Sequence, residues 1–201
     1  MLDNFLEWLL TKEDFVAWFL SDKFWKACLI YLLIITPIEM LIHELGHYYF
    51  QIKYKIQVVL FKIGIFNLIE WQSAGGTKFV LGIPFLKAES RCLGETTDKE
   101  KTKNNPRSFY YVNRHPKERF ITALAGPMAA LIPAFLILAI YSLLNGESLT
   151  VYFLLLVVIV GELMNLIVPF KLPWKGGALS SDAWIAITSL WQWWKWKAKK
   201  Q

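Results

Sequence analysis

The chain has 201 residues, of which 55% are hydrophobic, and it contains 10 tryptophans and 14 phenylalanines. This composition argues against an ordinary soluble protein and favours one membrane-embedded domain over residues 1–201. The formal net charge is +6, but the basic residues lie beside apolar segments, so we expect a lipid bilayer as a partner and no nucleic acid.

Residues 1–23 contain two short amphipathic pieces, which we expect to be interfacial helices on the membrane surface. Three apolar runs then follow that are long enough to cross a bilayer. These predicted spans cover residues 24–50, 120–144 and 150–170. Pro37 should kink the first span, because proline removes a helical hydrogen bond.

The segment 51–119 differs from the predicted spans in composition. Its first part is rich in β-branched and aromatic residues, and the turn sequence SAGG interrupts it. We predict a β-hairpin region that forms a small sheet against the membrane, followed by a polar cytoplasmic loop. Tryptophans and lysines in residues 183–198 predict a C-terminal interfacial helix, with a fourth span as the alternative. The expected fold is a mostly α membrane protein with a three-span core, a membrane-associated sheet between spans one and two, and interfacial helices at both ends.

The first span ends in IEMLIHELGHYYF, which places several polar groups where hydrocarbon makes them expensive. His43 and His47 are one helical turn apart, so both imidazoles can reach one metal ion. Glu44 projects to the side, where it can contact a water on that metal. This H-E-x-x-H pattern predicts one zinc ion held by the two histidines, with Glu44 as general base.

The distribution of lysine and arginine predicts the orientation of the chain. Residues 1–26 hold three of these residues, residues 51–119 hold thirteen, and the tail from Lys171 holds six. We therefore expect a multi-pass protein of the cell membrane with its N-terminus outside and its C-terminus cytoplasmic. Counted from Ala27 at the outer surface at 1.5 Å per residue, His43 then lies roughly 24 Å deep, in the cytoplasmic third of the membrane.

Three sequence elements in this order resemble the site-2 protease family of intramembrane zinc metalloproteases. They are HELGH on the first span, AGP at residues 125–127, and NLIVPF…SSDAW from Asn165 to Trp184. The resemblance covers most of residues 24–184. It implies a zinc metalloendopeptidase that cuts membrane-embedded or membrane-adjacent peptide segments, and a small member without an accessory domain.

The resemblance also implies roles for individual residues. His43 and His47 bind zinc with Asp182 as the third ligand, Glu44 is the catalytic base, and Asn165 helps to hold the substrate backbone. Two features depart from the usual family pattern. Ala183 follows Asp182 where glycine is usual, and Asp182 comes 17 residues after Asn165 where eight or nine are common.

Other residues compete for some of these roles. Glu162 and His115 are alternative third ligands, since glutamate and histidine both bind zinc. Asp182 could instead be an ordinary cap at the start of the C-terminal helix. Glu39 lies one turn before His43 on the same face, which predicts a supporting role near the metal or on a water path. Its alternative is a protonated glutamate bonded to a neighbouring helix.

Together these patterns predict an intramembrane endopeptidase that acts near the cytoplasmic side on transmembrane or membrane-associated substrates. Two alternatives belong to other classes. The chain could be a membrane binding or immunity protein that kept a protease fold, or a membrane-surface peptidase for small peptides. An exposed strand in residues 56–92 could pair with an extended substrate.

Overall fold

The computed structural model describes residues 17–83, 87–92, 111, 114–144, 148–169, 171–174 and 177–198. Helices dominate this part of the chain, and three of them are long and apolar enough to cross a membrane. Their bounds are Asp22–Lys53, Pro116–Leu143 and Thr150–Ile167. The mostly helical fold with three candidate spans is thus confirmed. The interfacial helices expected before residue 17 and the loop expected at residues 93–110 lie outside the described residues.

The first candidate span joins three helical elements end to end. They are α3 (Asp22–Ile30), the π turn η1 (Tyr31–Ile35) and α4 (Thr36–Lys53). The backbone N–H of Thr36 donates to the carbonyl of Tyr31, five residues back, and the Thr36 hydroxyl donates to the same oxygen at 2.9 Å. Pro37 follows in the first turn of α4, and it has no N–H to donate within this continuous helix. The irregularity predicted at Pro37 is therefore a π turn directly before it.

A sheet of four strands follows α4. The strands are β1 (Val58–Ile63), β2 (Phe66–Gln72), β3 (Lys78–Ile83) and β4 (Ala88–Cys92), in the order β2-β3-β1-β4. β1 and β3 are parallel, and the other neighbours are antiparallel. The first strand-like run breaks at Gly64, whose φ of +93° a residue with a side chain rarely adopts. The SAGG sequence joins β2 to β3 as a hairpin.

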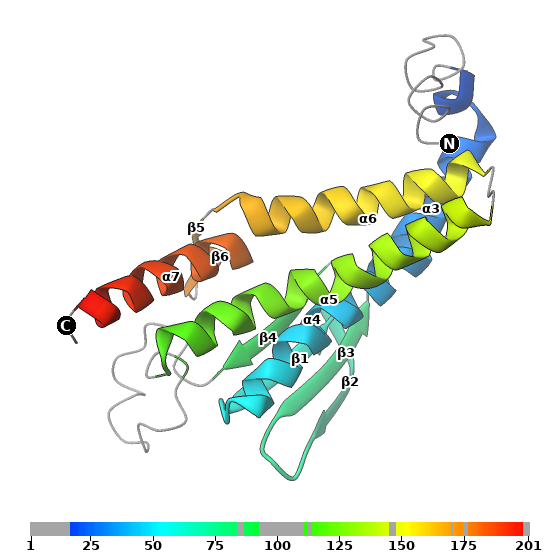
Figure 1. Cartoon of the computed structure of the whole chain (residues 1–201). Helices are drawn as coiled ribbons and strands as arrows, with labels where there is room; N and C mark the ends of the chain where they lie inside the picture. Colours follow the sequence, from blue (N-terminus) through cyan, green and yellow to red (C-terminus); the bar gives the residue numbers. More distant parts are fainter. Residues whose placement is uncertain are drawn as a thin grey trace.

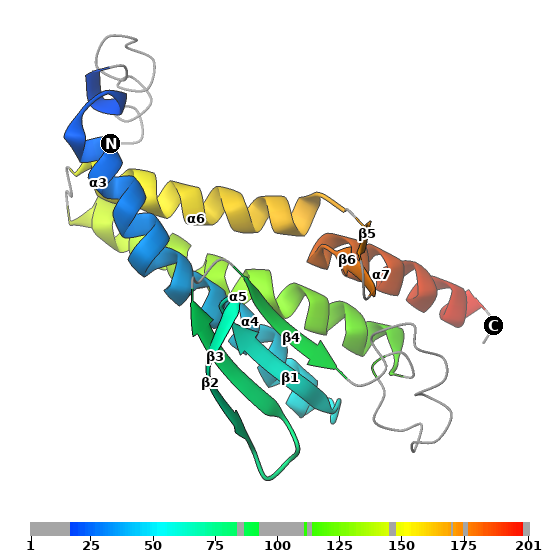
Figure 2. The ribbon, with the colours of Figure 1, turned by 180° about the vertical axis from the view of Figure 1, so that it is seen from behind.

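The sheet packs against α4, as Figure 2 shows from behind. β1 and β4 both contact this helix, and Ser90 on β4 donates a hydrogen bond to Gln51 on α4 at 2.6 Å. Ile56, Val58 and Cys92 form a buried apolar cluster beneath the end of α4. β4 is an edge strand, so its outer side has no paired neighbour among the described residues.

Helix α5 (Pro116–Leu143) lies at the centre of the helical layer (Figure 1). It contacts α4, α6 (Leu149–Ile167) and α7 (Asp182–Ala198). It begins four residues before the predicted start at residue 120. Pro116 occupies the first turn, and the side chain of His115 accepts a hydrogen bond from the backbone N–H of Lys117 at 3.2 Å.

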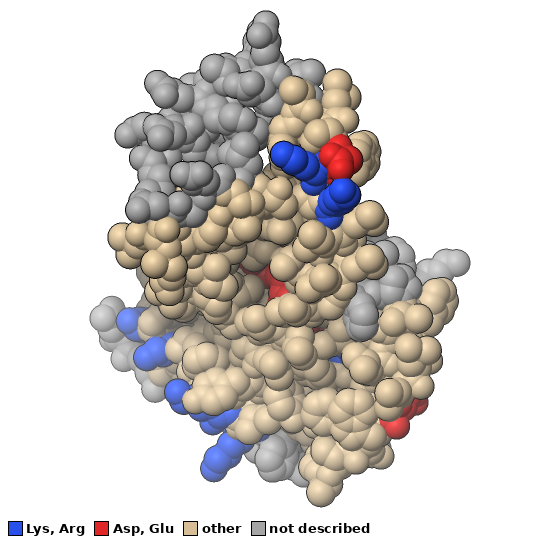
Figure 3. All heavy atoms as spheres, turned by 90° about the vertical axis from the view of Figure 1, so that its right-hand side faces the viewer, with Lys and Arg blue, Asp and Glu red and all other residues tan. Residues whose placement is uncertain are grey.

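Charged side chains gather toward the two ends of the molecule in Figure 3, and the broad band between them carries few charges apart from acidic atoms in a central hollow. Large apolar side chains on the candidate spans are correspondingly exposed, including Leu33 at 71% and Leu143 at 81%. Such a surface suits lipid contact, because a protein in water rarely exposes so large an apolar area.

α4 and α5 approach each other closely at Gly46. A Cβ atom added at Gly46 would stand 2.7 Å from Cβ of Ala129 and 2.9 Å from the carbonyl carbon of Ala125. Both distances are shorter than real carbon–carbon contacts. Small residues at a helix crossing allow this approach, and they are a common means of packing helices in membranes.

We predict that Gly46→Ala destabilises the fold by about 1–3 kcal/mol, because the methyl group forces α4 and α5 apart. Thermal unfolding in detergent, followed by circular dichroism, measures the change. Gly75→Ala is the matched control, since the nearest atom to its added Cβ would be Ser73 Oγ at 3.8 Å. Equal midpoints for the two variants would contradict the close packing.

Candidate metal centre and active site

Three side chains that are far apart in the sequence meet beside α5. The Nε2 atoms of His43 and His47 lie 3.1 Å apart, as expected for residues one turn apart on α4. The carboxylate of Asp182, at the start of α7, lies 3.2 Å from Nε2 of His43 and 3.3 Å from Nε2 of His47. One ligand atom from each residue can thus be chosen so that all three lie within 4.8 Å of one another.

The other ring nitrogens show which atoms are free to bind a metal. Nδ1 of His43 lies 2.9 and 3.0 Å from the two carboxylate oxygens of Glu162, and Nδ1 of His47 lies 2.7 Å from the carbonyl oxygen of Thr122. Both partners only accept hydrogen bonds, so each neutral ring carries its proton on Nδ1. Each Nε2 then presents a lone pair toward the Asp182 carboxylate. These converging acceptors repel one another unless a cation lies among them, so the site fits a metal ion.

Gly126 leaves the space that the two imidazoles occupy. A Cβ atom at this position of α5 would stand 2.6 Å from Cε1 of His47 and 2.7 Å from Nε2 of His43. Pro127, the next residue, is among the most deeply buried side chains of the described chain. The AGP sequence therefore matters because its glycine has no side chain at the closest point between α5 and the histidines.

Asp182 reaches the site through a short hairpin that the sequence did not predict. β5 (Lys171–Trp174) pairs with β6 (Gly177–Ser180) between α6 and α7. Ser181 donates a side-chain hydrogen bond to the carbonyl of Val168 at 2.9 Å and accepts one from the backbone N–H of Trp184 at 3.3 Å.

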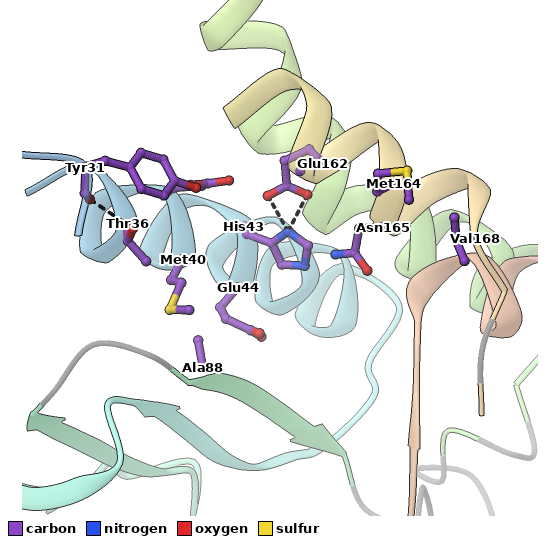
Figure 4. Close-up of a pocket in the computed structure, with 12 residues that line it drawn as sticks. Tyr31, Thr36, Met40, His43, Glu44, Ala88, Glu162, Met164, Asn165 and Val168 are labelled. Atoms are coloured by element: carbon purple, nitrogen blue, oxygen red, sulfur yellow. Dashed lines mark hydrogen bonds and ion pairs between the residues drawn. The ribbon is translucent and has the colours of Figure 1, made fainter. Parts of the chain in front are cut away.

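Glu44 lies beside these residues and is 8% exposed. Its Oε2 atom is buried and has no hydrogen-bond partner in the part of the chain that the structure describes. Together with His43 and Asn165, Glu44 lines a cavity of about 500 Å³ between α4, α6 and β4 (Figure 4). A buried carboxylate without a partner is costly, so it points to a group that the cavity is built to receive.

The remaining candidates take other positions. Glu162 is 4% exposed and binds the Nδ1 side of His43, away from the converging Nε2 atoms. His115 caps α5, and its ring meets the ring of Trp196 edge-on, with 4.5 Å between the ring centres. Glu39 lines the cavity, and its hydrogen-bond partner is Tyr31 rather than a histidine. Sequence reasoning considered Glu162 only as a ligand, because spacing does not tell which ring nitrogen a carboxylate will face.

We predict that Asp182→Ala loses most of the bound metal, because it removes an atom that faces both Nε2 atoms. Glu162→Ala should retain the metal in excess zinc but bind it about ten- to a hundred-fold more weakly, since it only orients His43. Metal content and zinc titration of the purified proteins measure both effects. His115→Ala serves as a control and should match the parent protein. Loss of metal in Glu162→Ala with retention in Asp182→Ala would reverse the two assignments.

Comparisons with known proteins identify the family of the chain. Residues 29–194 match the family model of Peptidase family M50, a stretch that includes both histidines, Glu44 and Asp182. A Thermotoga maritima protein named "Putative zinc metalloprotease" is 28% identical to this chain over 109 residues, which is 54% of this chain. The match spans only 22% of the length of that relative. Because the family match covers most of the chain, the chain belongs to peptidase family M50, the site-2 protease family of membrane zinc metalloproteases.

Proposed function

We propose that this protein is a zinc-dependent endopeptidase that cuts membrane-embedded or membrane-adjacent peptide segments near the cytoplasmic side. His43, His47 and Asp182 would hold one zinc ion. The observation that carries the proposal is the buried Oε2 atom of Glu44 beside these three side chains, which has no hydrogen-bond partner among the described residues. A site that only bound metal would have no need of a carboxylate in that position.

The residues divide the chemistry of peptide hydrolysis between them. Bound zinc would polarise the scissile carbonyl and make its water more acidic. Glu44 accepts a proton from the attacking water on its carboxylate and passes it to the leaving amine. Glu162 and the Thr122 carbonyl hold the Nδ1 protons of the two histidines, which keeps both rings in the orientation that binds metal.

The substrate has to be extended, because a helix hides its carbonyl groups in its own hydrogen bonds. The outer edge of β4, which pairs with no other strand in the described part of the chain, is suited to pair with such a segment, and Ala88 at the start of β4 lines the same cavity as Glu44. Asn165, on the opposite wall of that cavity, can hydrogen-bond the peptide backbone. The substrate backbone would then lie between β4 and α6.

We propose a multi-pass membrane protein with its N-terminus outside and its C-terminus cytoplasmic. The excess of lysine and arginine in residues 51–119 and in the tail supports this orientation. Lys195 and Lys197 each lie over a tryptophan ring of α7, at 3.6 and 4.7 Å from the ring centres. This combination of aromatic and basic groups suits a helix in the headgroup region of the cytoplasmic surface.

We predict that Glu44→Gln abolishes cleavage and leaves the fold and the zinc content unchanged, because glutamine has nearly the same shape and Glu44 is not one of the proposed ligands. Cleavage of a helical membrane substrate by the purified protein, with and without a zinc chelator, measures the activity. Substantial residual proteolysis by the Glu44→Gln protein would contradict the proposed mechanism. Cleavage of soluble peptides alone would favour a surface peptidase, and zinc-dependent binding without cleavage would favour a binding protein.

We predict that a reporter fused after Gln201 reads cytoplasmic, because the basic tail resists translocation. A second reporter, placed ahead of Met1, should read outside. Each terminus is fused in turn to a reporter that is active only in the cytoplasm and to one that is active only outside it, and the two signals are compared. An external signal from the C-terminal fusion would show that α7 crosses the membrane as a fourth span.

A further inference from the structure

The cavity beside the metal centre extends past the groups that hydrolysis requires. Beyond His43 and Glu44 it is lined by Tyr31, Thr36 and Glu39. In the orientation proposed above, these three residues lie on the side away from the cytoplasm. Peptide hydrolysis as argued above uses none of these three residues. Polar groups at this depth are costly, so their presence indicates a function.

The π turn η1 directs Tyr31 toward Glu39. The Tyr31 hydroxyl donates a hydrogen bond to Oε2 of Glu39 at 3.2 Å, although the two residues are eight positions apart. In an uninterrupted α-helix such residues point roughly 80° away from each other. A π turn accommodates one extra residue, so the pair behaves as if it were seven positions apart and shares a face. The irregular turn therefore brings these side chains together in the cavity.

One oxygen of Glu39 is left available by this arrangement. Oε1 has no hydrogen-bond partner among the residues that the structure describes, and Gly161 on α6 stands opposite it. A Cβ atom at Gly161 would lie 3.9 Å from Oε1, so a larger side chain there would cover the carboxylate. Because Gly161 has no side chain, the acceptor atom stays open to the cavity.

The charge of the cavity wall identifies the chemistry that suits this oxygen. Glu39, Glu44 and Glu162 line the cavity, and no lysine or arginine is among the described residues that do so. Figure 3 shows acidic atoms at the floor of a hollow within the band that otherwise carries few charges. The three carboxylates of Asp182, Glu44 and Glu162 would already exceed the two positive charges of one bound zinc ion, so no positive charge among the described lining residues remains for Glu39. A hydrogen-bond donor, and above all a cationic one, complements it.

We propose that Glu39, held by Tyr31, forms a specificity subsite that receives a hydrogen-bond-donating side chain of the substrate, with lysine preferred over glutamine and glutamine over an apolar residue. This inference rests on the proposed peptidase function. Glu39 and His43 are about 6 Å apart along the helix axis, and an extended peptide advances about 3.3 Å per residue. The preferred position is therefore about two residues from the scissile bond, on the side deeper in the membrane.

Binding measurements on the Glu44→Gln protein test the subsite without requiring cleavage. The probes are synthetic leucine- and alanine-rich membrane segments in nanodiscs, with a single lysine, glutamine or norleucine placed at successive positions. At one position along the segment, the probe with lysine should bind about ten-fold more tightly than the probe with norleucine, and the probe with glutamine should have an intermediate affinity. Adding Glu39→Gln should remove the advantage of lysine but keep that of glutamine, and Glu39→Leu should remove both. Tyr31→Phe should reduce the affinity ratio of the lysine probe to the norleucine probe several-fold.

Glu70→Gln is the matched control, because it removes an exposed carboxylate on β2 that pairs with Lys78 outside the cavity. It should leave the whole pattern of preferences unchanged. The proposal is wrong if no position prefers a donor, or if Glu39→Leu keeps the preference. Should Glu39→Leu fail to fold, the comparison of lysine with glutamine in Glu39→Gln decides. If the Glu44→Gln protein shows the binding preference but the parent protein cleaves no substrate, the proposed peptidase function is refuted and the subsite is still supported.

Discussion

The close approach of α4 and α5 is the constraint on which the metal centre depends. Gly46 and Gly126 have no side chains at the crossing, so the histidine rings lie directly over α5. Only at this separation can the Thr122 carbonyl reach Nδ1 of His47 at 2.7 Å and set its tautomer. In a lipid environment the hydrophobic effect does not press helices together, so packing of small residues has to supply this contact.

The parts of the fold that local sequence determines were predictable. Apolar runs of sufficient length mark the three candidate spans, and the four-residue spacing of His43 and His47 places both rings on one face. Tertiary contacts decide the remainder. Glu162 meets His43 across 119 positions, and nothing in its own helix predicts which ring nitrogen it faces. The division of one strand-like run into β1 and β2 depends on a single left-handed glycine, Gly64.

The cavity combines two kinds of structure that a membrane normally keeps apart. Helices satisfy their own backbone groups, whereas the edge of a sheet presents unpaired ones, which lipid cannot accommodate. β4 is anchored to α4 through Ser90 and Gln51, and Ala88 at its start faces the cavity that Glu44 lines. An edge held beside polar side chains can remain open to a peptide and still be sheltered from hydrocarbon.

The hydrogen bond between Ser181 and Val168 joins the two ends of the connection from α6 to α7. The β5–β6 hairpin lies between these residues, so it starts from a base that this hydrogen bond already closes. Insertions or deletions in the hairpin can therefore change its length without shifting Asp182 toward or away from the histidines. The long spacing between Asn165 and Asp182 then reflects the length of the hairpin. Sequence spacing is therefore a poor guide to whether a related chain keeps its third metal ligand. What such a chain has to preserve is the closure at the base.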